Sequence, residues 1–349
     1  MSLSESIRAL VSGKSPNPTR ESAALKDIFR GDPNPVQVSA WLTALSIRGE
    51  TPEILAALVE VMRSHAKPFP VPRHESGIPP LVDTCGTGGD NSGSFNVSTA
   101  AGLIAAASGG RVVKHGNRSA SSRCGSADLL EAAGICLDPP PEVSARMLEL
   151  FGFAFLYARE YHPAMRIVGK IRTDLGFRTV FNLLGPLSNP AKVKRQLLGV
   201  FSRVWVRPIA EALKTLGHEH ALVVHGNGLD EIALDEPTYA FEVKDGTVKE
   251  FFIDPEKLPV RKASKSEFAG GDSSRNVEIL WQILSGTKSS ASEVSILNAG
   301  AVLYISGLAE NLTEGIHKAR ATVETKKAAE HFSAMIDFQK KINEGSESV

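Results

Sequence analysis

The feature that most constrains the fold is a glycine-rich polar segment, Asp83 to Ala100, which reads Asp-Thr-Cys-Gly-Thr-Gly-Gly-Asp-Asn-Ser-Gly-Ser-Phe-Asn-Val-Ser-Thr-Ala. The apolar run Ile78 to Val82 before it predicts a buried strand despite two prolines, and the Ala-rich run Ala100 to Ala107 after it predicts a helix. The N–H groups of such a loop and of the helix start can converge on an anion. A strand, a glycine loop and a helix in this order therefore suit a phosphate ligand.

The composition of this loop favours a ligand site over a plain tight turn. Its glycines allow backbone with positive φ and close approach of a ligand, and short polar residues follow them at a density that a turn does not need: Asp90, Asn96, Ser98 and Thr99. Ser98 could also be the N-cap of the helix, and we expect it to cap and to bind. The loop lacks the Lys-Ser/Thr ending of a P-loop and the Gly-x-Gly-x-x-Gly of a dinucleotide site, so ATP and NAD are not the first choice of ligand.

The charge balance makes a nucleic-acid or membrane partner unexpected. The 349 residues include 39 Lys plus Arg and 39 Asp plus Glu, so no long-range field attracts a polyanion. A chain of this length predicts two domains or one large one. Residues 1–10 do not resemble a signal peptide and no run of about 18 apolar residues occurs, so we expect a cytoplasmic protein.

The first 66 residues predict four short helices. Helical apolar spacing precedes Gly13 and Gly31, which end the first two. Asn34-Pro35 and Thr51-Pro52 each place a capping residue before a proline, which starts the third and fourth. Residues 67–80 then contain five prolines and a glycine, the composition of a linker.

The rest of the chain alternates strands and helices, so we expect an α/β domain with a mostly parallel sheet. The strand candidates are Arg111 to Val113, Phe153 to Ala158, Gln196 to Phe201 and Ala221 to His225. Tyr239 to Ile253 alternates around Asp245-Gly246, which predicts an antiparallel hairpin. Three helical stretches follow from Asn276, the last being Leu312 to Ile342. Polar loops that follow parallel strands gather at one edge of the sheet, where open α/β folds bind ligands.

A second polar loop follows the strand at Arg111 to Val113. It runs from Lys114-His115-Gly116-Asn117-Arg118 through a serine-rich stretch to Ser126, which can cap the next helix. Such a cluster is often only a solvated loop, but its place beside the glycine loop favours a site. Lys114 supplies a point charge for phosphate, and Asn117 can donate and accept. His115 could act as an acid or base, or it could stack or form a hydrogen bond.

Three further groups are candidates for substrate or metal contacts. Arg172 and Arg178 suit a carboxylate or phosphate, although Arg178 is better explained as a tie between a helix end and its neighbours. His162 begins a polar and apolar pair suited to an aromatic substrate. Asp230-Glu231 follows a strand, and such a pair is commonly surface charge. Beside anion loops it is better explained as a Mg²⁺ ligand pair, which implies a polyphosphate.

With these residues assembled, the chain resembles the anthranilate phosphoribosyltransferases, enzymes of tryptophan biosynthesis. The likeness covers nearly the full length and rests on four ordered motifs: Gly86-Thr87-Gly88-Gly89-Asp90, Lys114 to Arg118, Arg172 to Pro190 and Gly228-Leu229-Asp230-Glu231. The resemblance implies a fold like that of the pyrimidine nucleoside phosphorylases, with a helical domain at residues 1–76 that also takes residues 167–190, and an α/β phosphoribosyl-binding domain at residues 77–349. It also implies a homodimer formed through the helical domains.

The resemblance implies transfer of the 5-phosphoribosyl group of phosphoribosyl pyrophosphate (PRPP) to the amino group of anthranilate, with release of pyrophosphate. The residues implied for PRPP are Gly86, Gly89, Asp90, Ser94, Asn96, Val97, Ser98, Thr99, Lys114, His115, Gly116, Asn117, Arg118, Ser119, Ala120, Ser121, Ser122 and Ser126. Those implied for anthranilate are Gly86, Asn117, Arg172, His115 and His162, and those for Mg²⁺ are Ser98, Asp230 and Glu231. Because leaving-group charge is what must be stabilised, no residue is expected to act as an essential acid or base.

Two other functions are considered. A pyrimidine nucleoside phosphorylase shares the implied architecture, but those enzymes resemble one another in a Lys-His-Ser-x-Gly-Gly loop, whereas Gly116-Asn117 follows Lys114-His115 here. A catalytically silent relative could bind single-stranded nucleic acid in the anion site. That function needs a basic groove with interleaved aromatics, and zero net charge with 6% aromatic residues gives it no support.

Overall fold

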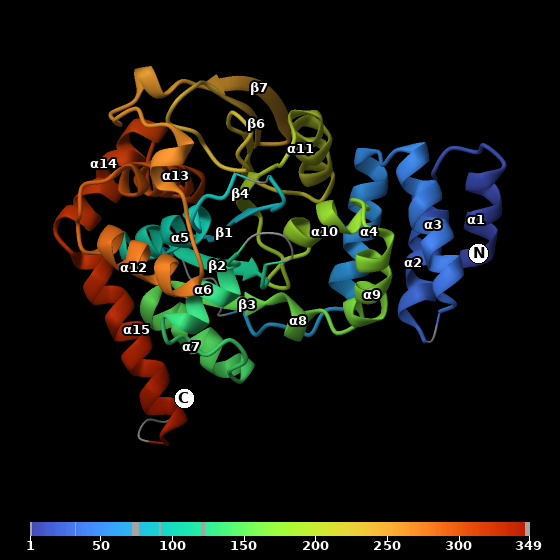
Figure 1. Ribbon diagram of the computed structural model, residues 1–349, viewed down its shortest axis with the longest axis horizontal. Coiled ribbons are helices and arrows are strands. Elements are labelled where there is room, and N and C mark those ends of the chain that lie inside the picture. Colours follow the sequence, from blue (N-terminus) through green and yellow to red (C-terminus); the bar gives the residue numbers. More distant parts are fainter. Residues whose placement is uncertain (1, 32, 72–76, 91, 120–122, 346–349) are drawn as a thin grey trace.

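A computed structural model describes residues 2–31, 33–71, 77–90, 92–119 and 123–345, with the side chain of residue 343 also left aside. Figure 1 shows a small layer of helices at one end of a larger body built on a central sheet. The expected α/β class, with a small helical part at the amino end, is confirmed. Within the described residues, no helix is long and apolar enough to cross a membrane.

The four predicted N-terminal helices are present: α1 (Leu3–Val11), α2 (Pro18–Phe29), α3 (Pro35–Arg48) and α4 (Pro52–Ser64). Each is preceded by an N-cap residue whose side chain accepts a hydrogen bond from the first turn: Ser2, Asn17, Asn34 and Thr51. Their apolar faces meet around Trp41, which is fully buried. The Trp41 Nε1 donates to the buried carboxylate of Glu21 at 2.9 Å, so the polar atom in this core is satisfied.

The central sheet has seven strands in the order β3-β2-β1-β4-β5-β6-β7. Their bounds are β1 (Leu81–Gly86), β2 (Arg111–Gly116), β3 (Phe153–Tyr157), β4 (Arg195–Gly199), β5 (His220–His225), β6 (Thr238–Lys244) and β7 (Thr247–Ile253). The first five are parallel, and the predicted hairpin β6–β7 adds two antiparallel strands at one edge. The carboxyl ends of the parallel strands therefore lie along one edge, as the sequence predicts.

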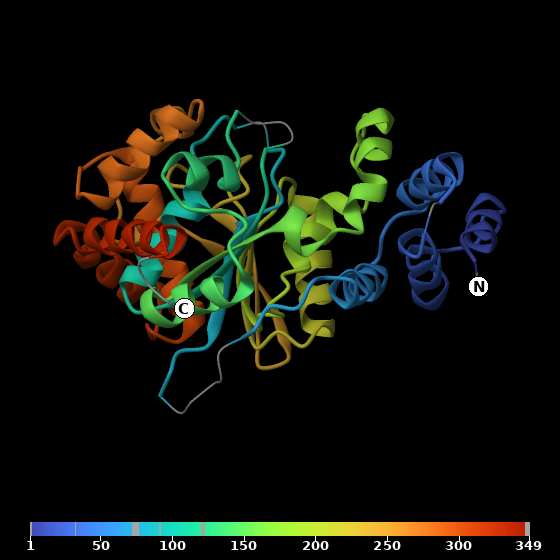
Figure 2. The same cartoon turned by 90° about the horizontal axis from the view of Figure 1, so that it is seen from below.

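Helices cover both faces of the sheet, as the two views in Figures 1 and 2 show. The remaining helices are α5 (Val97–Ala107), α6 (Ser126–Ala132), α7 (Pro141–Phe151), α8 (Ala158–Tyr161), α9 (Met165–Leu175), α10 (Phe181–Leu187), α11 (Val206–Thr215), α12 (Ser273–Leu284), α13 (Ser290–Ser306), α14 (Leu312–Glu324) and α15 (Lys327–Asn343). The Ala-rich α5 is buried on nearly every side between β1, β2 and α13. On the other face, α11 packs on β5 and β6 and joins the sheet to α4.

A segment from the middle of the chain returns to the helical layer. Helix α9 packs on α2 and α3, and α10 packs on α4. Figure 1 shows α9 and α10 between that layer and the sheet. This arrangement is consistent with the predicted contribution of residues 167–190 to the helical domain, although the domain boundaries themselves stay a prediction.

Several predicted boundaries are wrong for identifiable reasons. The first strand begins at Leu81 instead of Ile78, because Pro79 and Pro80 offer no N–H to a ladder. The run Leu312 to Ile342 is two helices, since Lys326 has a φ of +61° and breaks it. The carboxyl part therefore holds four helices where three stretches are predicted.

Candidate active site

The carboxylate pair Asp230-Glu231 is carried back over the sheet by a tight turn after β5. Asn227 and Gly228 have φ values of +46° and +81°, and Gly226 and Leu229 exchange backbone hydrogen bonds of 3.0 and 2.8 Å. This Asn-Gly geometry is the two-residue turn that reverses a hairpin. The turn places the pair at the carboxyl ends of the strands, as the sequence predicts.

Glycines at three neighbouring strand ends leave room for this pair. Gly86 on β1 and Gly199 on β4 are register partners. A Cβ at Gly86 would lie 2.2 Å from Asp230 Oδ2, and one at Gly199 would lie 1.5 Å from the Asp230 carbonyl oxygen. At the end of β5, a Cβ at Gly226 would lie 2.5 Å from the Glu231 carbonyl oxygen. The close approach of the pair to the sheet therefore requires all three glycines.

Burial and the closeness of other carboxylates disfavour the ionised forms of Asp230 and Glu231. Burial, and next the nearby Asp90, raise the pKa of Asp230 to about 7. Burial, and next Asp230, raise the pKa of Glu231 as well, while Lys114 lowers it. Both side chains lie close to the start of α5, where Glu231 Oε1 accepts from the Ser98 N–H at 3.0 Å. Crowded anions of this kind are relieved by a bound cation.

The glycine loop is bonded to these carboxylates and to β4. The Gly88 N–H donates to Asp230 Oδ2 at 2.6 Å, and the Asp230 N–H donates to Asp90 Oδ2 at 3.3 Å. The Thr87 N–H donates to the Gly199 carbonyl, and its hydroxyl accepts from the Phe201 N–H, both at 2.9 Å. Gly88 and Gly89 have φ values of +70° and +73°, which only glycine adopts readily.

The far end of this loop is held by a segment that sequence reasoning missed. Ser94 forms a bridge with Ala269, and the Gly270 N–H donates to the Gly93 carbonyl at 2.8 Å. Asn276 Nδ2 donates to Asn96 Oδ1 at 2.9 Å. No motif marks the segment around residues 268–276, so only the folded chain could reveal its role.

One local prediction around the loop is wrong. Ser98 is not the N-cap, because α5 begins at Val97 and Asn96 occupies the cap position, where its side chain accepts no hydrogen bond from the first turn of the helix. Val97 and Thr99 are buried, so their side chains pack inside the fold. Ser98 is half-buried, and its Oγ accepts from Lys114 Nζ at 3.0 Å.

Lys114 lies inside β2 and not in the loop after it. The strand runs to Gly116, so Lys114 and His115 point to opposite faces of the sheet. Lys114 is 1% exposed, and its Nζ also donates to the Thr84 carbonyl at 2.6 Å. In this structure its charge faces the carboxylates from within the protein instead of standing free for phosphate.

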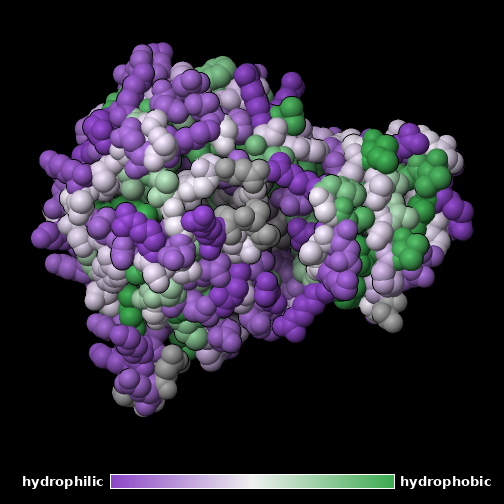
Figure 3. Space-filling model, viewed as in Figure 1, coloured by the Kyte–Doolittle hydropathy of each residue, from purple (hydrophilic) through white to green (hydrophobic). Residues whose placement is uncertain are grey.

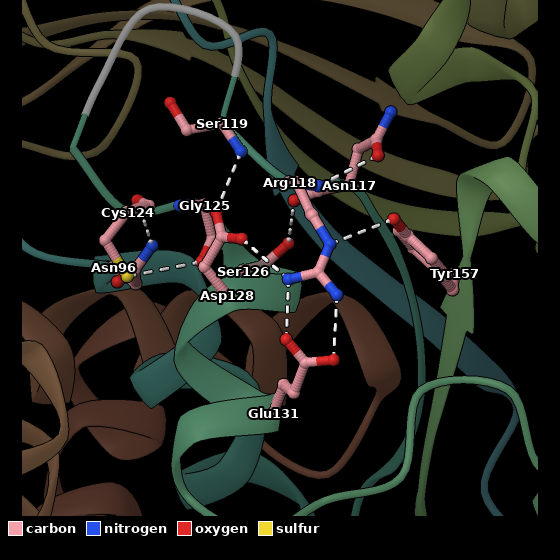
Figure 4. A network of polar contacts seen from close by, with 10 residues as sticks. All are labelled: Asn96, Asn117, Arg118, Ser119, Cys124, Gly125, Ser126, Asp128, Glu131 and Tyr157. Atoms are coloured by element: carbon pink, nitrogen blue, oxygen red, sulfur yellow. Dashed lines mark hydrogen bonds and ion pairs between the residues drawn. The ribbon is translucent and has the colours of Figure 1, made fainter. Parts of the chain in front are cut away.

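The loop that follows β2 is closed by an internal network shown in Figure 4. Arg118 forms ion pairs with Glu131 at 2.6 Å and Asp128 at 3.0 Å, and its Nε donates to the Tyr157 hydroxyl at 3.2 Å. Asp128 also accepts from the N–H groups of Ser119 and Gly125. Gly125 occupies the N-cap position of α6, so Ser126 is the first residue of the helix and not its predicted cap. The predicted Ala120, Ser121 and Ser122 lie outside the described residues.

On the opposite face of the sheet, two neutral histidines lie together. The rings of His115 and His162 have centroids 5.1 Å apart, and His162 Nε2 lies 3.1 Å from the Ser188 carbonyl. Burial lowers the pKa of His162 to about 4, and burial with the neighbouring His162 lowers the pKa of His115. They form a buried, uncharged pair, here called the histidine wall, and Asn117, which follows the end of β2, is exposed.

A buried aspartate fixes this wall to the sheet. Asp83 on β1 accepts from the His115 N–H at 3.3 Å and from Asn189 Nδ2 at 2.9 Å. Asn189 also donates to the Val113 carbonyl at 2.8 Å. Burial raises the pKa of Asp83 to about 6. Asn189 lies in the Arg172 to Pro190 block, but its type alone gives no sign of this supporting role.

Arg172 and Arg178 lie on the α9–α10 segment with different surroundings. Among the described residues none forms a hydrogen bond or ion pair with the Arg172 guanidinium, which lies 5.6 Å from the centre of the Phe181 ring. Burial lowers the pKa of Arg172, and no anionic group among the described residues pairs with it to offset that burial. Arg178 instead donates through Nη2 to the Gly89 carbonyl and stacks on Phe201.

The oxygen ligands at the strand ends fit a hard cation. Asp230 and Glu231 are consecutive there, and Glu231 is bonded to the Ser98 backbone. Mg²⁺ typically needs only one or two carboxylates besides water and substrate phosphate. Within the described part of the chain, no group of three or more His, Cys, Asp or Glu side chains forms a complete metal cage. The arrangement therefore suits a cation that arrives with a phosphate ligand.

Comparisons with known proteins match most of the length of this chain. Residues 4–66 match the helical bundle domain of a glycosyl transferase family, and residues 78–329 match the α/β domain of that family. Anthranilate phosphoribosyltransferase of Rubrobacter xylanophilus is 45% identical over 325 residues, 93% of each chain. That of Thioalkalivibrio sulfidiphilus is 42% identical over 97% of this chain and 99% of its own.

Solved structures agree with this match. The Thermus thermophilus anthranilate phosphoribosyltransferase superposes with a TM-score of 0.90 at 41% identity, and 96% of this chain and 99% of that one are covered. The Saccharomyces cerevisiae enzyme, solved in complex with PRPP and Mg, has a TM-score of 0.87 at 28% identity over 96% and 97% of the two chains.

Proposed function

This chain belongs to the anthranilate phosphoribosyltransferases, and from that premise we propose how its residues carry out the reaction. The protein is a transferase of tryptophan biosynthesis that moves the 5-phosphoribosyl group of PRPP to the amino group of anthranilate. A bond forms between the anthranilate nitrogen and the anomeric carbon, the bond from that carbon to pyrophosphate breaks, and the amine loses a proton.

The observation that carries the residue assignment is the placement of Asp230-Glu231 over the strand-end glycines, bonded to the glycine loop. The loop N–H groups and the start of α5 offer donors for the phosphates. We assign the donor site to Gly86, Gly89, Asp90, Ser94, Asn96 and Ser98, with Asn117 completing it. Lys114 and Arg118 support this site from inside, through Ser98 and through α6.

The acceptor site is assigned to the wall across from the loop. Arg172, a cation without an ionic partner among the described residues, is suited to the anthranilate carboxylate, since a guanidinium binds a carboxylate through two parallel hydrogen bonds. His115 and His162 are neutral and line the approach of the aromatic ring. Neither is assigned as a base, because an aromatic amine attacks once the leaving group departs readily.

Mg²⁺ is the proposed cofactor, held by Asp230, Glu231 and Ser98. When bound, it neutralises charge that develops on pyrophosphate. The protein holds the Asp230 and Glu231 carboxylates over strand ends whose glycines leave room for them. It also aligns the amine of anthranilate with the anomeric carbon of PRPP, so that little motion precedes the attack.

A homodimer formed through α1 and α3 is the proposed assembly. Val36 and Ile47 lie on one face of α3, each 76% exposed, and Val11 at the end of α1 is 69% exposed. Figure 3 shows apolar side chains over this end of the molecule. Exposed apolar residues gathered in this way are typical of a protein interface.

The direct test follows anthranilate fluorescence with purified protein, PRPP and Mg²⁺, and with controls that omit each component. Loss of signal should require all four, and the product pyrophosphate should appear in equal amount. Phosphorolysis of thymidine or uridine without anthranilate turnover would instead favour the nucleoside phosphorylase alternative.

A further inference from the structure

We propose that Arg178 is a positioning residue that couples two parts of the protein, an inference that rests on the proposed function. One part is the acceptor segment, which comprises α9, α10 and the turn between them (residues 165–187). The other is the donor loop, which is the glycine loop after β1 around residues 86–90. Arg178 lies in the turn between α9, which carries Arg172, and α10. Its guanidinium reaches across to the glycine loop, where Nη2 donates to the Gly89 carbonyl. The sequence favours a mere tie at a helix end, but the structure shows that the partner belongs to the phosphate loop.

The second contact of Arg178 is Phe201, two residues after the end of β4. The Arg178 Cζ lies 3.8 Å from the centre of the Phe201 ring, and a cation over an aromatic face is attracted to it. The Phe201 N–H is bonded to the Thr87 hydroxyl of the same loop at 2.9 Å. Arg178 therefore contacts the loop both directly and through the strand end that anchors it.

The bond to Gly89 has a consequence for the opposite side of the loop. Because a peptide unit is planar and trans, a Gly89 carbonyl turned toward Arg178 directs the Asp90 N–H away from it. The preceding residue, Gly88, is bonded to Asp230 Oδ2 at 2.6 Å. Arg178 thus sets the orientation of the Asp90 N–H, two residues from the Gly88 contact with Asp230.

This geometry connects two half-sites through a short chain of contacts. One end is the segment that carries Arg172, and the other is Asp230. A loose glycine loop would misplace PRPP, and a free α9–α10 turn would misplace anthranilate. Arg178 contacts Gly89 of the assigned donor site and lies on the segment that carries Arg172, so its loss should affect the use of both substrates.

The test uses Arg178→Gln, the milder Arg178→Lys, and the matched control Arg166→Gln. Arg166 lies on α9, is 71% exposed at its side chain and pairs only with Glu160, at 3.6 Å, among the described residues. We expect Arg178→Gln to lower kcat/KM for PRPP and for anthranilate, each by about 10-fold or more, since small misplacements of reacting groups are costly. Arg178→Lys should keep the charge and recover part of the rate, and Arg166→Gln should match the unmodified protein.

Amide hydrogen exchange gives a readout that does not depend on activity. Without substrates, Arg178→Gln should speed exchange at residues 87–90, and Arg166→Gln should not. Phe201→Leu removes the stacking face, and Arg178→Gln should cost less in that background than in the unmodified protein, because contacting residues are not additive.

Unchanged exchange at residues 87–90 would overturn the proposal, and so would an effect confined to the KM of anthranilate, which would make Arg178 a substrate ligand. If the unmodified protein transfers no phosphoribosyl group, the proposed function fails, and the exchange measurement still decides whether Arg178 holds the loop.

Discussion

The donor loop and the acceptor segment face each other but are built in different ways. The glycine loop is bonded to β4, to Asp230 and to residues 268–276, and it approaches the sheet where glycines leave no side chain. The α9–α10 segment holds Arg172 without an ionic partner in the described chain, next to neutral histidines. The proposed polyphosphate site is thus held in shape by backbone contacts, whereas the proposed carboxylate site keeps a charge without an ionic partner among the described residues.

The largest effect should come from breaking the close packing on the donor side. Gly86→Ala would place a methyl group 2.2 Å from Asp230 Oδ2 and push that carboxylate away. We expect kcat to fall by about 100-fold or more, as misplacement of catalytic groups commonly does. Steady-state kinetics and a melting curve separate this loss from unfolding.

The matched control lies on the acceptor segment. Gly169 on α9 has nothing within 4 Å of its would-be Cβ. Gly169→Ala should keep full activity and stabilise the helix by about 1 kcal/mol. Equal activity in the two alanine variants would show that the donor side is not close-packed.

Substitution of Arg172 tests the proposed anthranilate site. Arg172→Ala should raise the KM for anthranilate by about 10- to 100-fold, the range expected for a lost charge-assisted hydrogen bond. The KM for PRPP should change far less. Lys170→Ala is the control, because Lys170 is exposed on the same helix and pairs with Asp174. Equal increases in both KM values would reject the assigned role of Arg172.

The burial of His162 predicts how the stability of the protein depends on pH. The pKa of His162 falls from 6.5 to about 4 on burial, so the unfolded chain binds more protons between these values and stability rises with pH across them. This ring should cost the fold about 2 kcal/mol between about pH 7 and about pH 5. Chemical denaturation of His162→Gln at both pH values should show a smaller difference than the unmodified protein. Exposed His317 provides a control in which Gln should leave the difference unchanged.

The smallest effect on catalysis should come from the far end of the helical layer. Ile47→Glu places a charge on the exposed apolar face of α3 and should turn a dimer into monomers in sedimentation velocity. Val204→Glu is the control, since Val204 is 73% exposed on the larger body. Activity per chain should stay within about twofold, because all residues of the two proposed substrate sites belong to one chain and lie away from the proposed interface. A monomeric unmodified protein would contradict the proposed interface.

The same contrast explains what the sequence could and could not predict. Local patterns identified α1–α4, the parallel sheet and the β6–β7 hairpin, because caps, prolines and alternation act within a few residues. Polar motifs located Asp230-Glu231 and the glycine loop. Lys114 was misplaced since a strand can continue into polar residues when the fold supplies partners such as Thr84 and Ser98.

Supporting residues were the least predictable. Asn276 and Asn189 act through contacts across long sequence separations, and neither belongs to a recognisable local pattern. Arg178 shows the same limit, because its importance depends on reaching Gly89, 89 positions earlier in the chain.

The tether between Asn96 and Asn276 has a consequence for how the protein is made. Its two ends are separated by 180 positions, and domains begin to fold while the amino-terminal part is already outside the ribosome. The glycine loop emerges early, but the partners that hold it, Asp230 and then Asn276, emerge late. During synthesis the glycine loop therefore lacks these hydrogen-bond partners until Asp230 and Asn276 have left the ribosome. A chain truncated before α12 would contain the loop sequence but not the Asn276 side chain that bonds to Asn96.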